Sequence, residues 1–319
     1  MTQSTARELS NKELEALVDG KQEVENTVEQ VWGEGTTKYV LDIDTVEKPD
    51  WIVEGLVVRQ GLTLVYGESQ VGKTTFCLYL IDALQTGKSF FNRKCKQAKV
   101  LIGEQDQSPP LLRAQKDKLG IPKKLWLVKV PLRWNNKKDE FNDDLKNLLH
   151  LCRPDVLIID AYTSLGIEDI NHPSVSLTFD WLRLYSQKYN CAFVLTHHTG
   201  LSGRQMGSNL NIAKMDSVIA LRKSGKKDKS KSKVFKITAS QEKLKADSCE
   251  DIELTFDTNN LRMTAEETIK DMVFRLKSEG KTDEDVKSEV TEGKPDSVGR
   301  YLREWAKEHK GEADFSAPL

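Results

Sequence analysis

The sequence lacks the features on which several large classes of protein depend. Its five cysteines are odd in number, lie far apart, and never occur with the two-residue spacing of zinc-binding or redox pairs. A disulfide framework and a zinc site are therefore disfavoured, and a reducing compartment is favoured. No apolar run approaches the roughly 18 residues of a membrane span, and the N-terminus has no signal-peptide core. We expect a cytoplasmic protein with no membrane partner.

An excess of charge of either sign is also missing. The 319 residues contain 48 Lys or Arg and 49 Asp or Glu, which gives a formal net charge of −1. This balance excludes a polycation that binds nucleic acid through bulk charge, so any such binding needs local patches. The length predicts one large domain with a smaller addition.

The hydrophobic pattern divides the chain into three parts. Residues 1–45 are polar and acidic, and are either a docking arm or a loosely ordered tail. Residues 46–263 alternate short apolar runs with helical segments, which predicts an α/β core with a mostly parallel, twisted sheet. The predicted strands are 62–66, 100–102, 125–130, 156–159, 192–196, 217–221, 234–238 and 252–256, the last ones antiparallel at one edge. The predicted helices are 74–85, 110–119, 139–151 and 174–188.

Residues 264–319 form the third part. A helix is predicted over 264–278, a second begins at a capping box on Thr282 and Asp285, and a third begins at Pro295. Three short helices with these turns resemble a helix-turn-helix module. The part carries 10 Lys or Arg and 14 Asp or Glu, a net charge of −4, which argues against strong nonspecific DNA binding. Docking of replication proteins or a structural cap are the alternatives.

A phosphate-binding loop is the most specific motif. The segment from Gly67 to Thr75 reads GESQVGKTT, between an apolar strand and an amphipathic helix. Glycines let consecutive backbone N–H groups face phosphate oxygens, and the helix N-terminus adds its dipole. Lys73 is expected to reach the β- and γ-phosphates, and Thr74 to ligate Mg²⁺. The predicted ATP-binding residues are Gly67, Glu68, Ser69, Gln70, Val71, Gly72, Lys73, Thr74 and Thr75.

Two acidic residues at strand ends complete the expected ATP site. Asp160 ends the run VLIID and is predicted to hold Mg²⁺, because ligands bind at the carboxyl ends of parallel strands. Ala161 follows it, so the adjacent glutamate of many P-loop ATPases is missing. Glu104, at the end of VLIGE, is our candidate for polarising the attacking water. Asp106 competes for that role, and helix capping is the alternative role for Glu104.

Two histidines end a further strand. His197 and His198 follow FVLT, and neutral imidazole suits a sensor of the γ-phosphate because it donates or accepts a hydrogen bond. A metal pair or ordinary turn histidines are the alternatives. Zinc is disfavoured because no Cys or carboxylate lies at ligand spacing nearby.

Together these segments resemble the RecA-like P-loop ATPases, in particular the plasmid RepA-type hexameric replicative helicases. The resemblance covers about 49–256 and rests on WIVEG, GESQVGKTT, VLIGEQDQSP, VLIIDAYTSL, FVLTHHTG and RQMGSNLNIAKMDSVIAL. It implies that Glu104 is catalytic and that His197 or His198 senses the nucleotide. It also implies a DNA-facing loop at 200–209, with Arg204, Ser208 and Asn209 as contacts.

The resemblance further implies a homo-oligomer in the form of a hexameric ring. In such rings a basic finger from the neighbouring subunit completes each site. The matching stretch here carries Lys243 and Lys245, where the family often has arginine, and lysine lacks a planar fork. Solvated loop lysines are the alternative.

The leading hypothesis is therefore an ATP- and Mg²⁺-dependent motor on single-stranded or forked DNA, such as a replicative helicase. A RecA-fold ATPase switch or loader that does not unwind DNA is the second hypothesis. A DNA- or partner-binding adaptor with an attached ATPase is the third.

Overall fold

The computed structural model describes residues 43–104, 106–135, 140–141, 143–165, 175–199, 209–224, 233–245, 251–265, 267, 269–290 and 295–308. Residues 1–50 and 51–319 form separate units. In the first unit the described residues include a short 3-10 helix, η2 (Ile43–Thr45). Among the described helices, none combines the length and the apolar character that crossing a bilayer requires.

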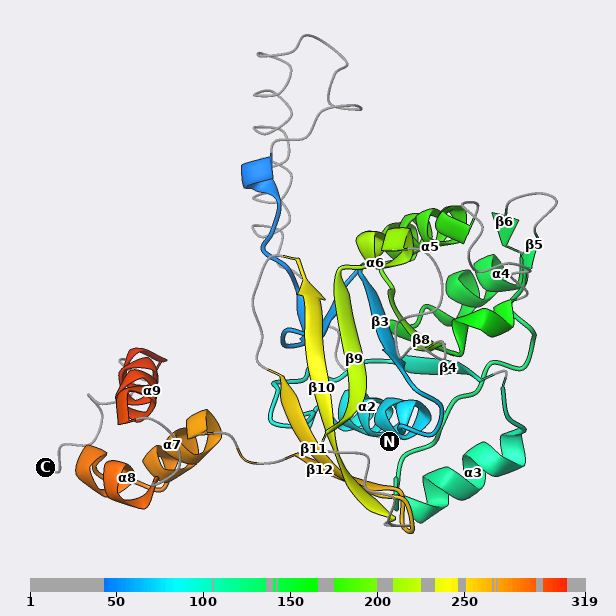
Figure 1. The fold of residues 1–319 in the computed structure, drawn as a ribbon. Coiled ribbons are helices and arrows are strands. Elements are labelled where there is room, and N and C mark those ends of the chain that lie inside the picture. Colours follow the sequence, from blue (N-terminus) through cyan, green and yellow to red (C-terminus); the bar gives the residue numbers. More distant parts are fainter. Residues whose placement is uncertain are drawn as a thin grey trace, which may run out of the picture. The chain divides into compact units, whose positions relative to one another are not determined.

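An eight-stranded sheet organises the second unit (Figure 1). Its parallel part has the order β9-β3-β8-β7-β4. The strand that leads into the P-loop is thus separated from the strand of Asp160 by one inserted strand. These strands are β3 (Leu62–Gly67), β4 (Val100–Glu104), β7 (Val156–Asp160), β8 (Ala192–His198) and β9 (Ser217–Ser224). Every residue of β3 and β7 is buried, as expected of strands covered on both faces.

Three antiparallel strands extend the sheet beyond β9. They are β10 (Val234–Leu244), β11 (Ile252–Asp257) and β12 (Arg262–Ala265). The antiparallel extension confirms the sequence prediction, and the mixed sheet with its P-loop is a RecA-like core. The helix predicted from Thr264 was placed too early, because Thr264 pairs with Thr255 in β12 and the helix begins at Ile269.

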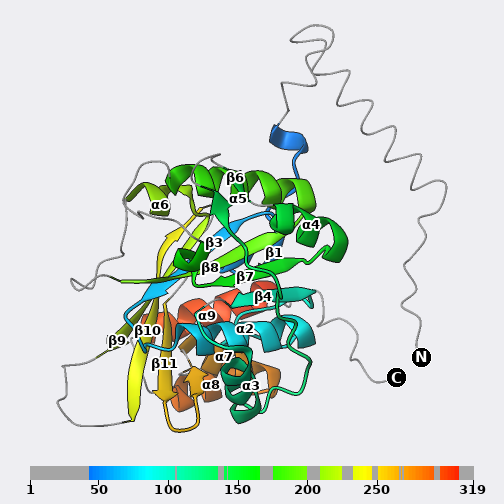
Figure 2. The ribbon, with the colours of Figure 1, turned by 90° about the vertical axis from the view of Figure 1, so that its right-hand side faces the viewer.

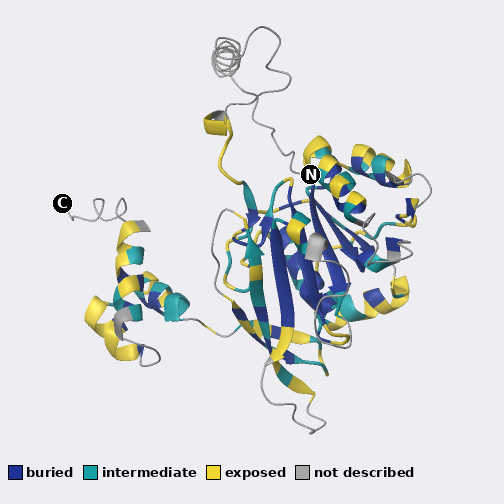
Figure 3. Ribbon diagram, turned by 45° about the horizontal axis from the view of Figure 1, so that its top comes forward, coloured by how far each residue is buried: buried dark blue, intermediate teal, exposed yellow. Residues whose placement is uncertain are grey.

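Helices cover both faces of the sheet (Figure 2). One face carries α2 (Lys73–Thr86) and α3 (Pro109–Lys118), and the other carries α4 (Asp143–Cys152), α5 (Val175–Tyr189) and the short α6 (Asn209–Lys214). Two apolar cores result, one on each face. Figure 3 shows the central strands as buried, and the edge strands and outer helix surfaces as partly exposed.

Smaller elements surround this core. A hairpin of β1 (Trp51–Val53) and β2 (Val57–Val58) precedes β3. A second pair, β5 (Trp134–Asn135) and β6 (Glu140–Phe141), precedes α4. The 3-10 helix η3 (Tyr162–Leu165) follows β7. The strand predicted over 125–130 is reduced to one parallel bridge, between Leu127 and Ile102 at the edge of the sheet.

Three helices follow β12. They are α7 (Ile269–Ser278), α8 (Asp283–Glu289) and α9 (Pro295–Glu308), which share an apolar core that includes Val273, Val286 and Leu302. The predicted capping box is confirmed, since Thr282 accepts from the Asp285 amide and the Asp285 carboxylate accepts from the Thr282 amide. The likeness of these helices to a helix-turn-helix stays a prediction.

Candidate ATP-binding site

The P-loop lies between β3 and α2, and two of its glycines are required by space and backbone. A Cβ on Gly67 would lie 2.5 Å from the Leu221 carbonyl oxygen. Gly72 has φ of 99°, and a Cβ there would lie 2.3 Å from the Met263 methyl group. The loop therefore passes close to β9 and β12, and its tight turn exposes Glu68, Ser69 and Gln70.

Lys73 begins α2 and is 6% exposed. Its ammonium group lies 3.0 Å from the Gly67 carbonyl oxygen, 2.9 Å from that of Glu68, and 3.1 Å from His198 Nδ1. Burial lowers the pKa of Lys73, although the Asp160 carboxylate acts in the opposite direction. The ammonium group is buried next to two loop carbonyls and a histidine, which suits the binding of an incoming polyanion.

Asp160 lies beside Thr74 at the end of β7. The Thr74 hydroxyl donates to Asp160 Oδ2 at 2.7 Å, and the buried Thr196 hydroxyl donates to Asp160 Oδ1. Asp160 is only 4% exposed, so these hydroxyls satisfy a carboxylate that water hardly reaches. Two oxygen ligands next to a phosphate-binding loop fit Mg²⁺, which prefers carboxylates together with substrate phosphates. The adjacent Thr75 is buried in the first turn of α2, as expected for a packing residue.

Glu104 is the direct neighbour of Asp160 in the sheet, across the parallel pair of β4 and β7. Its carboxylate accepts hydrogen bonds from the amides of Asp106 and Gln107, at 2.8 and 3.1 Å, and from the Gln107 side chain at 3.0 Å. Burial, followed by the charge of Asp160, raises the pKa of Glu104 to about 7. These contacts lie in the turn before α3, whose N-cap is Ser108, so Glu104 does not cap the helix. A base that titrates near neutral pH suits proton abstraction from water.

The two histidines point to opposite sides of β8. His198 contacts Lys73, and its Nε2 lies 3.8 Å from Asp106 Oδ2, so it lies in the site. His197 is fully buried and packs edge-on against the Tyr162 ring at 4.9 Å between centroids. The alternation of side chains along a strand explains this difference. Of the two predicted sensors, the structure brings only His198 to the P-loop lysine.

Sequence reasoning missed Thr196. The signal was present, since Thr196 lies two residues before His198 and therefore on the same face of β8. What the sequence did not reveal is that β8 lies directly between β3 and β7, which places this hydroxyl against Asp160.

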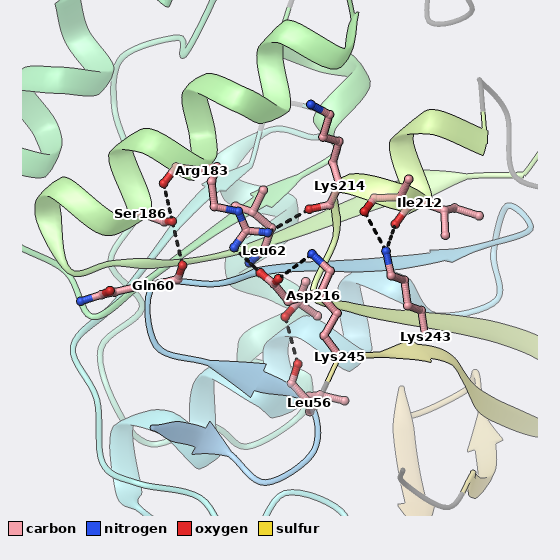
Figure 4. Close-up of polar contacts among 12 residues, drawn as sticks. Leu56, Gln60, Leu62, Arg183, Ser186, Ile212, Lys214, Asp216, Lys243 and Lys245 are labelled. Carbon is pink, nitrogen blue, oxygen red and sulfur yellow. Dashed lines mark hydrogen bonds and ion pairs between the residues drawn. The ribbon is translucent and has the colours of Figure 1, made fainter. Parts of the chain in front are cut away.

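Lys243 and Lys245 lie near Ile212 and Asp216 (Figure 4), and strand pairing places them at the end of the sheet opposite to the P-loop. Leu244 pairs with Ser217, and Ser217 pairs with Thr63 at the start of β3, whereas the P-loop follows Gly67. The length of β3 alone separates the two ends by about 16 Å, at about 3.3 Å per residue. These lysines are therefore not brought together with the P-loop of their own chain.

Both lysines have local partners there. Lys243 donates to the carbonyl oxygens of Ile212 and Ala213, each at 2.8 Å, and burial lowers its pKa. Lys245 lies 3.2 Å from Asp216, which also accepts hydrogen bonds from Arg183 and from the Leu62 amide. Burial raises the pKa of Asp216, but the hydrogen bonds outweigh burial and hold the pKa below its usual range.

The predicted DNA contacts Arg204 and Ser208 lie outside the described residues, and Asn209 is described only as the first residue of α6. In the part of the chain that the structure describes, no group of three or more His, Cys, Asp or Glu is placed to hold a metal ion. A zinc site at the two histidines gains no support from that region.

Comparisons with known proteins address the fold and the family. No curated protein matches the chain. Among solved structures, a KaiC-like protein from the hyperthermophilic archaeon Pyrococcus horikoshii OT3 is similar, at 14% sequence identity and a TM-score of 0.48. The similarity covers 68% of this chain and 94% of that chain.

A family model described as an AAA domain matches residues 37–204. The matched range is more than half of the chain and includes the P-loop, Glu104, Asp160, Thr196 and His198. The chain belongs to the AAA domain family.

Proposed function

We propose that this protein hydrolyses ATP and uses the reaction to act on DNA as a ring-shaped motor, such as a replicative helicase. The observation that carries the ATPase part is the convergence of Lys73, Thr74, Asp160, Glu104 and His198 at the carboxyl ends of adjacent strands. The part concerning DNA and unwinding rests on the sequence resemblance to RepA-type helicases.

Each residue has a role that follows from its place. The loop amides and Lys73 bind the β- and γ-phosphates, while Thr74 and Asp160 hold Mg²⁺, which when bound offsets phosphate charge. Glu104 accepts a proton from the attacking water as the water oxygen bonds to the γ-phosphorus and the bond to the β-phosphate oxygen breaks. His198, between Lys73 and Asp106, is placed to detect the loss of the γ-phosphate.

A catalytic role for Lys243 and Lys245 requires a site shared between subunits. Both lysines are too far from their own P-loop to stabilise its γ-phosphate, so only the P-loop of a neighbouring subunit in a homo-oligomeric ring could use them. The alternative is a purely structural role, through their contacts within their own chain. Mixing Lys243→Ala subunits with Lys73→Ala subunits tests this. Partial recovery of ATP turnover supports a shared site, and turnover by a strictly monomeric protein at a concentration-independent rate contradicts it.

The test of the motor is unwinding of a forked DNA duplex with ATP and Mg²⁺. We expect strand separation by the wild type and none by Lys73→Ala. Hydrolysis of ATP without strand separation contradicts the helicase and favours the switch or loader, for which the same site geometry serves equally well.

A further inference from the structure

The charge of the chain is distributed unevenly. Residues 109–135 contain seven Lys or Arg and one acidic residue, whereas the whole chain has a net charge of −1. This stretch, which we call the basic edge, comprises α3, the turn after it and the segment beside β4. Since β4 is the last strand on its side of the sheet, the basic edge lines an outer edge of the core (Figure 1). Its basic residues are Arg113, Lys116, Lys118, Lys123, Lys124, Lys129 and Arg133.

The backbone of the basic edge is held in place. The Lys116 ammonium donates to the Ile121 carbonyl oxygen at 2.8 Å, which closes the turn after α3. The Gln85 side chain donates to the Lys124 carbonyl oxygen at 2.7 Å, which ties the turn to α2. Further along, the Ile102 amide donates to the Trp126 carbonyl oxygen at 3.0 Å. The charges therefore project from a fixed frame.

The cations of the basic edge face solvent. Lys118, Lys123, Lys124 and Lys129 are exposed, and none of them pairs with a carboxylate of the described residues. The single acidic residue, Asp117, lies 3.6 Å from Arg113 and both are well exposed. Such exposed pairs contribute little, so the charges of Lys118, Lys123, Lys124 and Lys129 are not neutralised by carboxylates of the described residues.

An exposed aromatic ring lies among these cations. The side chain of Trp126 is 56% exposed, and the Lys124 ammonium lies 5.9 Å from the centre of its ring. Lysines at the edge of a sheet need no ligand to explain them, because they prevent the edge from pairing with a strand of another chain. That explanation does not account for the exposed indole ring of Trp126, which provides a flat stacking surface beside a cation.

We propose that the basic edge binds single-stranded nucleic acid. The lysines contact phosphates, and Trp126 stacks on a base, which is the combination used by proteins that bind single strands without reading their sequence. This site is additional to the proposed function, because it uses neither ATP nor residues 200–209. It provides a second contact for a strand outside the predicted DNA-facing loop.

The experiment is equilibrium binding of a fluorescein-labelled 20-nucleotide oligothymidine to the full chain without nucleotide, at several salt concentrations. Each lysine that contacts a phosphate contributes about 0.7 to the slope of log K against log salt. Lys123→Ala/Lys124→Ala is expected to lower this slope by about 1.4. Trp126→Ala is expected to weaken binding by about 5- to 150-fold, since stacking contributes ~1–3 kcal/mol per base.

Matched variants separate the basic edge from general effects. Lys188 also lies over an aromatic ring, 5.5 Å from that of Tyr189 on α5, but outside the basic edge. Lys188→Ala should therefore bind as the wild type does. Trp126→Phe should retain most of the affinity and lose the quenching of tryptophan fluorescence that the oligonucleotide causes. Unchanged affinity and slope in both basic-edge variants would overturn the proposal.

Two other outcomes are decisive. If the basic-edge variants abolish self-association of the chain and leave oligonucleotide binding intact, the edge is a protein contact and the proposal is wrong. If oligonucleotide binding depends on the basic edge while ATP turnover is insensitive to DNA, the proposal stands and the motor function fails. Basal ATP turnover of Lys123→Ala/Lys124→Ala should equal that of the wild type.

Discussion

Glu104 links the pH dependence of stability to that of activity. Burial, then the charge of Asp160, raises its pKa from 4.5 to about 7 in the folded chain. The Glu104 carboxyl group ionises near pH 4.5 in the unfolded chain but only near pH 7 in the folded chain. The free energy of unfolding therefore falls as the pH rises from about 4.5 to about 7. At 1.36 kcal/mol per pKa unit this shift has an upper bound of about 3 kcal/mol, and solvent screening of the half-buried carboxylate reduces the effect to about 1–2 kcal/mol. That is still a sizeable fraction of the ~5–15 kcal/mol that stabilises a typical domain.

The substitution Glu104→Gln removes this titration and keeps an oxygen to accept from the Asp106 and Gln107 amides. We expect equal free energies of unfolding for wild type and variant at pH 4, and a variant about 1–2 kcal/mol more stable at pH 8. Urea unfolding at four or five pH values measures both curves. Asp106→Asn, at an exposed neighbouring carboxylate, should follow the wild type. Parallel curves for wild type and Glu104→Gln would refute the reasoning.

The ionisation of Glu104 should also control the rate of ATP turnover. With a pKa of about 7, the ionised fraction of Glu104 falls from about nine-tenths at pH 8 to about one-tenth at pH 6, so kcat should fall about tenfold. Glu104→Gln should retain ATP affinity and lose about 10²–10⁴-fold in kcat. A full loss in Asp106→Asn with none in Glu104→Gln transfers the role to Asp106.

Other substitutions test the rest of the site and the C-terminal helices. Lys73→Ala should weaken ATP binding by about 10–100-fold in a titration, because it removes charge-assisted contacts to phosphate; near wild-type affinity contradicts the P-loop assignment. Thr196→Val removes a buried hydrogen-bond donor to Asp160, so it should lower the free energy of unfolding by about 1–3 kcal/mol and raise the Mg²⁺ concentration needed for turnover. Thr196→Ser keeps the hydroxyl and should match the wild type in both measurements. Thr282→Ala removes the cap of α8, so it should lower the free energy of unfolding of α7–α9 by about 1 kcal/mol without changing ATP binding. A loss of ATP turnover in this variant would contradict a purely capping role.

Local signals were sufficient to predict much of the fold. Continuous apolar runs predicted β3, β4, β7 and β8, and the capping box at Thr282 predicted the start of α8, because these features act over a few neighbouring residues. The short helix α6 was missed, and β12 was taken for the start of a helix. Pairing of β12 with β11 decides that segment, and such pairing is not encoded within it.

Some residues of the candidate site were likewise predictable from local sequence, and others were not. The P-loop and Asp160 follow from motif and strand position, whereas the contact of Thr196 with Asp160 depends on strand order. The two adjacent histidines were indistinguishable in sequence, and only their alternation on β8 separates His198, at Lys73, from His197, under Tyr162. The raised pKa of Glu104 depends on burial and on Asp160, which lies 56 positions further along the chain.

The rate of ATP turnover, measured with and without single-stranded DNA, tests the central claim most directly. If the protein is an ATP-driven motor on DNA, saturating oligothymidine should raise kcat several-fold in the wild type. Lys73→Ala should remain inactive under both conditions. A wild-type rate that is the same with and without DNA would contradict the motor and leave a P-loop ATPase whose partner is not DNA.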